Sequence, residues 1–477
     1  MHNLFRQYFN YTPDVTKVLC LVLISLFSLR LVSLGMYPLF DTTEARYGEI
    51  ARLMLETQNW VTPQFDYGVP FWGKPPFHTW LSAASFATFG VSEFFARLPH
   101  LLIGLLTTFV IYRFVSKVAE VGQAIVSVFV LASTLGFILA IGMVMTDSSL
   151  LLAYTLAMVS FWLNYNDETS SLYGYYFFAA LALGMLVKGP VAVVLVVIAL
   201  FIWSLWKKQF VKALFSLPWK SGFPLFWLLA APWYVLAEMR TPGFLEYFII
   251  GEHIQRFLVS GWEGDLYGSA HDRARGMIWV YWIVCAFPWS FFIIKALFSN
   301  LKQPYTTTKA DVKIQPYLLA WMFAPLVLFT FAGNILPIYV MPGFGAMAVY
   351  VAIAFSLSKR LVLAGTLTLC VLSVLIGLLT LGKVTLPTAQ TLLETKKIDT
   401  KKTQLYYWHK RPFSAQFYSQ GDAKLLKSKV LLKSLLDERV TFYLVMNVAQ
   451  LRYVGDTMKS HCEVINVVDE NSLYQCN

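Results

Sequence analysis

The chain has 477 residues, of which 57% are hydrophobic and only 14% are charged. A soluble protein carries about a quarter charged residues, so the composition excludes a soluble multidomain protein. The formal net charge of +11 does not indicate nucleic-acid binding, because lysine and arginine gather in the cytoplasmic loops of membrane proteins and no basic stripe suited to a duplex occurs in the sequence.

The first apolar run, Val18 to Tyr37, ends in the bulky segment LGMYPLF. This segment lacks a small-residue cleavage site, so the run is predicted to be a signal anchor. Apolar runs of the length needed to span about 30 Å of hydrocarbon recur along the chain. We expect about eleven spans, at 18–37, 98–116, 122–142, 146–165, 173–188, 190–206, 221–238, 275–297, 314–333, 338–357 and 360–382.

The stretch from Phe77 to Val91 is apolar but short, and such stretches are more often interfacial or re-entrant than spanning. With a cytoplasmic N-terminus, the clusters that begin at Lys207 and Lys359 are cytoplasmic only if this stretch does not cross. We therefore predict that it does not cross. The following segments then share the extracytoplasmic face: loops 38–97 and 239–274, Thr146–Asp147, Lys188–Gly189, Ile335–Tyr339 and the tail.

The composition changes at about residue 384, which divides a transmembrane catalytic domain (1–383) from a hydrophilic domain (384–477). Two segments of the tail, TQLYYWH and RVTFYLVMNV, have strand character, and LLKSKVLLKSLL has helical spacing. We expect a small soluble α/β domain. Its lysines could contact anionic lipid head groups or an anionic acceptor, or could simply be solvated. Cys462 and Cys476 could form a disulfide in an oxidising compartment, and the sequence leaves this open.

Ionisable residues are dense in DTTEARYGEIAR, directly after the first span, where charged groups are costly and usually functional. Asp41 and Glu44 are candidate catalytic carboxylates, although both could instead cap the following helix. Glu49 and Arg52 lie three residues apart on a predicted helix, so a surface ion pair is the simplest interpretation.

Lys74 lies in FWGKPPFHTW, before two prolines that restrict the backbone. A lysine held among aromatic side chains at the interface suits a lipid-linked phosphate, and the alternative is a lysine that snorkels to the head groups.

Three further loops carry candidates on the same face. Asp147 lies in TDSSLLL, between two apolar spans, where an unpaired carboxylate is costly to bury. It is therefore expected to have a charged partner or a functional role, and it could also cap the next span. The segment FLEYFIIGEHIQRFLV is amphipathic, with His253 and Arg256 on one side, and is predicted to lie on the membrane surface. A lone surface histidine often has no role. Tyr339, in ILPIYVMP, is either a site residue or an interfacial aromatic residue.

A transporter or flippase of a lipid-linked sugar is the rival class. Transporters place polar groups at mid-membrane on broken helices. Here the charged groups converge from separate loops at one edge, and charged residues are scarce inside the spans. No Walker motif, dinucleotide-binding glycine loop, HExxH or CxxC cluster is present in the sequence.

The chain resembles a known family. TTEARYGEIARLML, NWVTPQFDYGVPFWGKPPFHTWL, FFARLP, MVMTD, LVKGP, EHIQRF and ILPIYVMP occur in the order seen in the aminoarabinose transferase and protein O-mannosyltransferase superfamily, whose members are GT-C fold membrane enzymes. The resemblance covers most of residues 38–345 and extends loosely to RPFSAQFYSQG in the tail.

The resemblance implies an inverting glycosyltransferase in the cell inner membrane, with its active site and C-terminus facing the periplasm. The donor would be a polyprenyl-phosphate sugar, and the acceptor an envelope lipid such as lipid A or lipopolysaccharide core, another glycan or a protein. Asp41 or Glu44 would be the base or orient the acceptor, and Lys74 and Arg46 would hold the donor phosphate. The other implied site residues are Tyr47, Asp147, His253, Arg256 and Tyr339.

Two departures from the family pattern matter. The family commonly has an acidic pair before the ARY segment, whereas Thr43 precedes Glu44 here, so the identity of the base stays open. In the aminoarabinose transferase a glutamate precedes the Lys-Pro and helps to bind a metal, whereas this chain has Gly73. We therefore expect neither a tightly bound metal nor another cofactor, and transfer of aminoarabinose to lipid A is itself in doubt.

Overall fold

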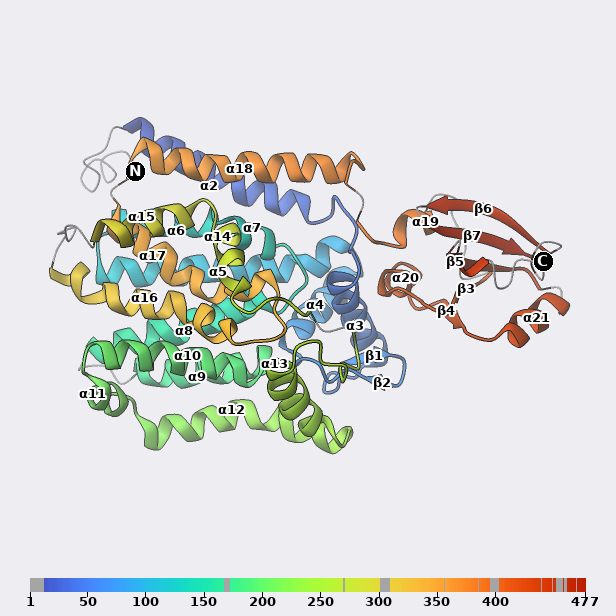
Figure 1. Ribbon diagram of the computed structural model, residues 1–477, viewed down its shortest axis with the longest axis horizontal. Coiled ribbons are helices and arrows are strands. Elements are labelled where there is room, and N and C mark those ends of the chain that lie inside the picture. The colour runs from blue at the N-terminus through green and yellow to red at the C-terminus, as the bar shows by residue number, and fades with distance from the viewer. Residues whose placement is uncertain are drawn as a thin grey trace.

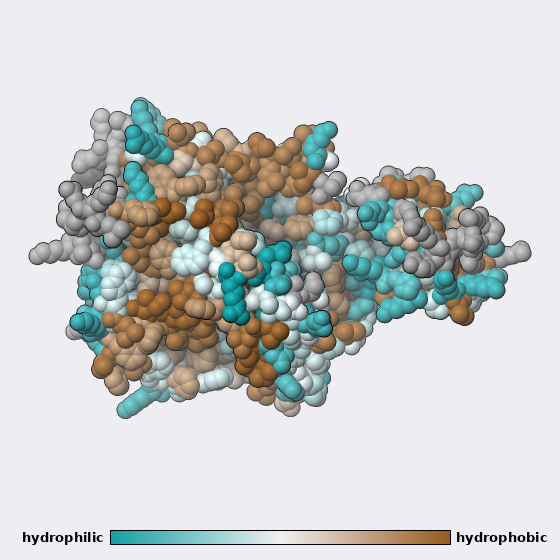
Figure 2. Space-filling view, in the orientation of Figure 1, coloured by the Kyte–Doolittle hydropathy of each residue, from teal (hydrophilic) through white to brown (hydrophobic). Residues whose placement is uncertain are grey.

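A bundle of long helices forms most of the molecule, and a small mixed sheet lies beyond one end of it (Figure 1). The computed structural model describes residues 13–166, 172–268, 271–300, 309–355, 357–384, 386–394, 403–438, 440–447, 449–451, 458, 461–468 and 470–477. The described N-terminal helix α2 (Pro13–Ser33) begins at the far end of the bundle from the sheet (Figure 1). Figure 2 shows broad apolar areas over the bundle and hydrophilic residues over much of the C-terminal part.

Five of the described helical segments are long and apolar enough to cross a membrane: Asp14–Ser33, Glu93–Val118, Trp219–Arg240, Pro337–Ala354 and Lys359–Thr380. They correspond to α2, α5 (Glu93–Val118), α12 (Trp219–Arg240), η2 (Pro337–Gly343) with α17 (Phe344–Ala354), and α18 (Lys359–Thr380). The rest of the bundle is α6 (Val121–Ala132), α7 (Leu135–Ala140), α8 (Asp147–Asn166), α9 (Leu172–Lys188), α10 (Pro190–Trp206), α11 (Phe210–Phe215), α14 (Met277–Cys285), α15 (Trp289–Asn300) and α16 (Lys309–Thr330). The polytopic helical fold is thus confirmed, and the number of crossings stays a prediction.

Two predicted spans are not continuous: 122–142 divides into α6 and α7, and 275–297 divides into α14 and α15. The sequence predicted a single helix over 275–297, but α14 and α15 meet there at 114°. Pro288 lies in the break, and proline cannot donate the backbone hydrogen bond that a continuous helix requires.

The elements of the two long polar loops lie at the end of the bundle that faces the sheet (Figure 1). They are α3 (Thr43–Thr57), β1 (Gln64–Asp66), β2 (Val69–Pro70), α4 (Phe77–Phe89), η1 (Glu246–Gln255) and α13 (Arg256–Leu258). The helix over the predicted non-crossing stretch, α4, has 13 residues. A straight helix of that length is shorter than the roughly 30 Å hydrocarbon layer.

The C-terminal part packs directly on α3. Its helix α20 (Phe413–Tyr418) places Phe417 over Gly48, where a Cβ atom would already lie 3.5 Å from the Phe417 ring. Arg52 donates two hydrogen bonds of 2.7 Å to Glu49, and both side chains are buried. The interpretation of this pair as a surface ion pair was therefore wrong, because the tail covers this helix.

The C-terminal sheet has the strand order β4-β3-β5-β7-β6. Its strands are β3 (Gln404–Trp408), β4 (Ala423–Leu426), β5 (Phe442–Asn447), β6 (Cys462–Val468) and β7 (Asn471–Cys476), and α19 (Gln390–Glu394) and α21 (Lys429–Asp437) complete the part. The first three strands are parallel, and β6 and β7 are antiparallel to their neighbours. Both predicted strand segments form strands. The segment with helical spacing is divided between β4 and α21.

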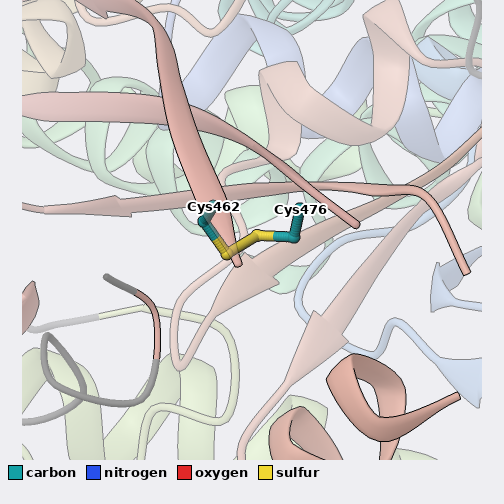
Figure 3. Close-up of a disulfide and its surroundings, with 2 residues drawn as sticks. All are labelled: Cys462 and Cys476. Atoms are coloured by element: carbon teal, nitrogen blue, oxygen red, sulfur yellow. A yellow bond between two sulfur atoms is a disulfide. The ribbon is translucent and has the colours of Figure 1, made fainter. Parts of the chain in front are cut away.

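Figure 3 shows Cys462 and Cys476 joined by a disulfide between the neighbouring strands β6 and β7. The two residues are directly opposite each other in the antiparallel register. The sequence left this pairing open because spacing alone cannot give strand register.

Candidate active site

Lys74 meets Glu252 of η1, from the other polar loop, and Glu252 also binds Arg256 at the start of α13. Its Nζ donates a hydrogen bond of 3.0 Å to Glu252, and Arg256 donates to both Glu252 oxygens at 2.9 and 3.0 Å. Burial opposes ionisation of Glu252, but the charges of Lys74 and Arg256 lower its pKa to about 2. This carboxylate is therefore ionised at any physiological pH and holds the two cations together.

Lys188 forms a second charged group close by. It ends α9 and donates a hydrogen bond of 2.6 Å to Asp147, the first residue of α8, and both side chains are buried. The Lys188 ammonium also lies 4.6 Å from the centre of the Tyr339 ring. Tyr339 is within electrostatic range of Lys74 and Arg256, so the two groups of charges adjoin each other.

His253 connects η1 to the break between α9 and α10. Its Nδ1 lies 2.7 Å from the Phe248 carbonyl, and its Nε2 lies 3.1 Å from the Lys188 carbonyl. Gly189 permits this approach, because its φ is +80° and a Cβ there would lie 2.6 Å from the Phe248 ring. The motif LVKGP therefore holds Lys188 and His253 beside each other.

These residues enclose a cavity of about 400 Å³. Its polar lining residues are Lys74, Lys188, Glu252, His253, Arg256, Asn334 and Tyr339. Its apolar lining residues are Pro190, Val191, Val194, Ile249, Ile254, Phe257, Leu328 and Phe329. A cavity lined by three cationic side chains and by aliphatic and aromatic side chains suits an anionic amphiphile.

Arg46 and Tyr47 lie beside this cavity and do not line it. Arg46 donates to the Tyr267 carbonyl at 3.1 Å, and its guanidinium lies 5.1 Å from the centre of the Tyr47 ring. Tyr47 packs edge-on against His78. Burial, with the nearby charges of His100, Lys74 and Arg46, lowers the pKa of His78 well below its ordinary value.

Glu44 is fully buried and bound to Arg97 on α5. The two side chains form hydrogen bonds of 3.0 and 2.7 Å, and Glu44 also accepts from the Val144 backbone at 3.0 Å. The guanidinium donates further to the carbonyls of Leu34, Tyr37 and Pro38. This arrangement fixes the chain where it leaves α2 and leaves Glu44 no exposed surface.

Asp41 lies apart from the Lys74 cavity. It accepts hydrogen bonds from the backbone and hydroxyl of Ser414 in the C-terminal part, and it lines a second cavity of about 530 Å³. Burial raises the pKa of Asp41, against the hydrogen bonds from Ser414 that lower it. The two carboxylates that the sequence could not rank are thus in different surroundings, and neither lines the Lys74 cavity.

Sequence reasoning missed three residues of the site. Glu252 and Lys188 stand in the quoted motifs without an assigned role. Asn334 donates to the carbonyls of Arg256 and Val259 at 2.6 and 2.7 Å, which fixes the end of η1. The energetic cost of an unpaired charge at a membrane edge was a usable signal for Glu252 and Lys188. Glu252 also directly precedes the candidate His253 in the sequence.

The residues beside Lys74 do not fit a metal site. A Cβ at Gly73 would lie 2.9 Å from the Phe71 ring, so an acidic side chain there needs that ring to move. Within the described part of the chain, no three His, Cys, Asp or Glu side chains are grouped so that they could hold a metal ion. Glu252 is already bound to two cations.

Comparison with known proteins shows which families and folds the chain is similar to. The family model for dolichyl-phosphate-mannose-protein mannosyltransferase matches residues 15–248. The undecaprenyl phosphate-alpha-4-amino-4-deoxy-L-arabinose arabinosyl transferase of Shewanella sediminis is 28% identical over 349 residues, which cover 71% of this chain and 60% of that protein. The enzyme of the same name from Aeromonas salmonicida is 29% identical over 332 residues, which cover 68% of this chain and 57% of the relative. The matches thus span less than two thirds of these relatives.

Among solved structures, ArnT from Cupriavidus metallidurans bound to undecaprenyl phosphate has a TM-score of 0.78 at 17% identity, covering 96% of this chain and 97% of that one. The apo oligosaccharyltransferase of Archaeoglobus fulgidus has a TM-score of 0.50 at 12% identity, covering 91% and 70%. This likeness shows the fold, and the chain is a membrane protein of the GT-C fold. The chain is thus similar to members of the aminoarabinose transferase and protein O-mannosyltransferase superfamily, which its motifs also resemble.

Proposed function

We propose that the chain is an inverting glycosyltransferase that moves a sugar from a polyprenyl-phosphate donor to an envelope lipid, glycan or protein. The observation that carries the proposal is the Lys74 cavity, which is lined by Lys74, Lys188 and Arg256 together with apolar side chains. The cationic side chains suit the phosphate and the apolar side chains suit the first isoprene units. The curated relatives are named as transferases that use an undecaprenyl-phosphate sugar.

Lys74 and Arg256 are the donors for the phosphate oxygens. Each keeps 19% of its side-chain surface exposed, whereas the Glu252 side chain between them is 2% exposed. Glu252 thus orients the two cations from behind, and their remaining N–H groups are available to the phosphate. His253 and Asn334 position η1, and Tyr339 fixes Lys188 through its ring.

In the proposed reaction the acceptor hydroxyl forms a bond to the anomeric carbon as the bond from that carbon to the phosphate oxygen breaks. The electron pair leaves with the phosphate, whose growing charge the fixed cations stabilise. The hydroxyl proton passes to Asp147. We assign this role to Asp147 because Lys188 connects it directly to the Lys74 cavity, whereas Glu44 is enclosed by Arg97 and Asp41 faces the C-terminal part.

Asp147→Asn is expected to lower kcat about 10²- to 10⁴-fold, which is the usual contribution of a general base. The change keeps the shape of the side chain but leaves the buried Lys188 ammonium without its charged partner, so the thermal midpoint should also fall and the rate is compared per folded molecule. The measurement is single-turnover transfer from a polyprenyl-phosphate sugar. Asp437→Asn, at an exposed position of α21, is the matched control. Wild-type rates in Asp147→Asn would remove the residue from the mechanism.

We also propose that transfer needs no tightly bound metal, since the donor set at Gly73 and Glu252 does not suit one. Dialysis against a chelator is expected to leave the transfer rate of the purified protein unchanged. Metal analysis of the same sample provides the comparison. A rate that falls on chelation and returns with zinc would contradict this proposal.

We propose that this end of the bundle and the C-terminal part face the periplasm of the inner membrane. The disulfide between Cys462 and Cys476 supports this orientation, because such bonds persist in oxidising compartments. A reporter that is active only in the periplasm should be active when fused after residue 477, and a reporter that is active only in the cytoplasm should be inactive there. An active cytoplasmic reporter would reverse the orientation, and would favour a different class such as a flippase.

A further inference from the structure

The cavity beside Asp41 lies between the C-terminal sheet and the loop that leaves α2. It is lined by Tyr407 and Trp408 at the end of β3 and by Met446 and Asn447 at the end of β5. The chain passes from β3 to β4 on one side and then returns to β5 on the other side, so the strand order reverses between β3 and β5. Ligands of parallel sheets bind outside the carboxyl ends of the strands at such a switch point.

The Tyr407 hydroxyl is a buried group that lacks a partner. The side chain is 3% exposed, and its oxygen has no hydrogen-bond partner among the residues that the structure describes. Leaving such a group unsatisfied is energetically costly, so buried hydroxyls are nearly always paired. Because Tyr407 lines the cavity, a polar ligand there would supply the missing bond.

Lys410 supplies a charge to the same cavity. It lines the wall, and within the described ranges it has no ion-pair partner. By contrast, the neighbouring Arg411 is bound to Asp66. Asp41 lies within electrostatic range of both Lys410 and Tyr407. The wall thus offers a hydroxyl, a carboxylate and a free ammonium, which is a set suited to sugar hydroxyls that lie next to an anionic substituent.

We propose that this cavity binds the acceptor as a saccharide with an anionic substituent, with Tyr407 and Asp41 bonded to its hydroxyls and Lys410 paired with its charge. The proposal rests on the glycosyltransferase function proposed above, which requires an acceptor. The C-terminal part then has a defined task, because it holds the acceptor at the bundle end that carries the donor site. Its contacts with the bundle, Asp41 with Ser414 and Asp66 with Arg411, fix the cavity in place.

The test is direct binding to the full-length protein in nanodiscs, with glucosamine 1-phosphate, glucosamine and inorganic phosphate as probes. We expect the sugar phosphate to bind at least about tenfold more tightly than either component, because both kinds of contact are then made. Lys410→Ala should weaken this binding about tenfold, and Tyr407→Phe about three- to tenfold. Lys424→Ala on β4 and Tyr443→Phe on β5 are the matched controls and should bind as wild type does.

Two measurements distinguish a loss of binding at this cavity from a loss of folding and from a loss of donor binding. Without a probe, Tyr407→Phe should keep or raise the thermal midpoint, because it removes an unpaired buried hydroxyl. Binding of the polyprenyl-phosphate sugar should be the same in Lys410→Ala and wild type. Equal binding of the sugar phosphate by Lys410→Ala, Tyr407→Phe and wild type would overturn the site. Preference for inorganic phosphate would also overturn it.

A glycolipid head group and a soluble sugar phosphate share this chemistry. In a second experiment, envelope glycolipid is presented in phosphatidylcholine vesicles as a competitor of glucosamine 1-phosphate. If the glycolipid displaces glucosamine 1-phosphate, and Lys410→Ala weakens this displacement, the cavity binds a lipid head group. Competition only by the soluble saccharide would assign it to a soluble acceptor. Binding that follows this pattern without any transfer would support the site and count against the proposed function.

Discussion

Lys74→Ala is expected to lower kcat/KM for the polyprenyl-phosphate sugar about 10²- to 10³-fold, the usual effect of removing one donor that stabilises developing charge. The fold should survive, because Glu252 keeps its two hydrogen bonds to Arg256 and remains a paired carboxylate. Most of the loss should appear in kcat, since the phosphate gains charge only as the sugar leaves. Steady-state transfer with purified protein measures both constants.

Lys433→Ala is the matched control, because Lys433 is an exposed lysine on α21 far along the chain from the cavity. It should transfer as wild type does. Lys74→Arg should recover part of the rate, since it restores the charge with a different geometry. If Lys74→Ala and Lys433→Ala had equal rates, the phosphate would have to bind elsewhere.

Glu44→Ala is expected to destabilise the protein by about 3–5 kcal/mol, because it leaves the buried Arg97 charge without its partner. The thermal midpoint in detergent and the folded yield should fall together. Glu56→Ala on the same helix is the matched control. Glu56 is 49% exposed and paired with Arg52, and such a partly exposed pair contributes about 1 kcal/mol or less.

Glu44→Gln separates the two roles that the sequence allowed for this residue. If Glu44 supports the fold, the midpoint and the transfer rate should fall in parallel. A variant with a wild-type midpoint and no transfer would instead show that Glu44 is the base. The double variant Glu44→Leu, Arg97→Met should recover only part of the stability, because the carbonyls of Leu34, Tyr37 and Pro38 would then lack their donor.

The sequence predicted which side chains come together better than it predicted how their charges pair. Lys74, His253, Arg256 and Tyr339 line one cavity, as expected from loops that share a face of the bundle. Charge bias and the lengths of apolar runs are local properties, so the sequence carries them directly. The strand segments of the tail were predictable for the same reason.

The pairing of charges was not predictable. Glu44 meets Arg97 across 53 positions, and Asp41 meets Ser414 across 373. No local pattern encodes such contacts. Charge density and the family pattern therefore made Asp41 and Glu44 candidate bases without ranking them, whereas the structure places Asp41 under the C-terminal part and Glu44 inside an ion pair. The buried Glu49–Arg52 pair was misinterpreted for the same reason, because the covering helix α20 lies far along the chain.

The most direct test of the central claim uses the purified protein in nanodiscs with a radiolabelled polyprenyl-phosphate sugar and extracted envelope glycolipid. The account predicts that label moves to the acceptor while free polyprenyl phosphate accumulates in equal amount, and that Lys74→Ala and Asp147→Asn each suppress both products. Label that stays on the carrier, or crosses the bilayer still attached to it, would contradict the claim and indicate a flippase.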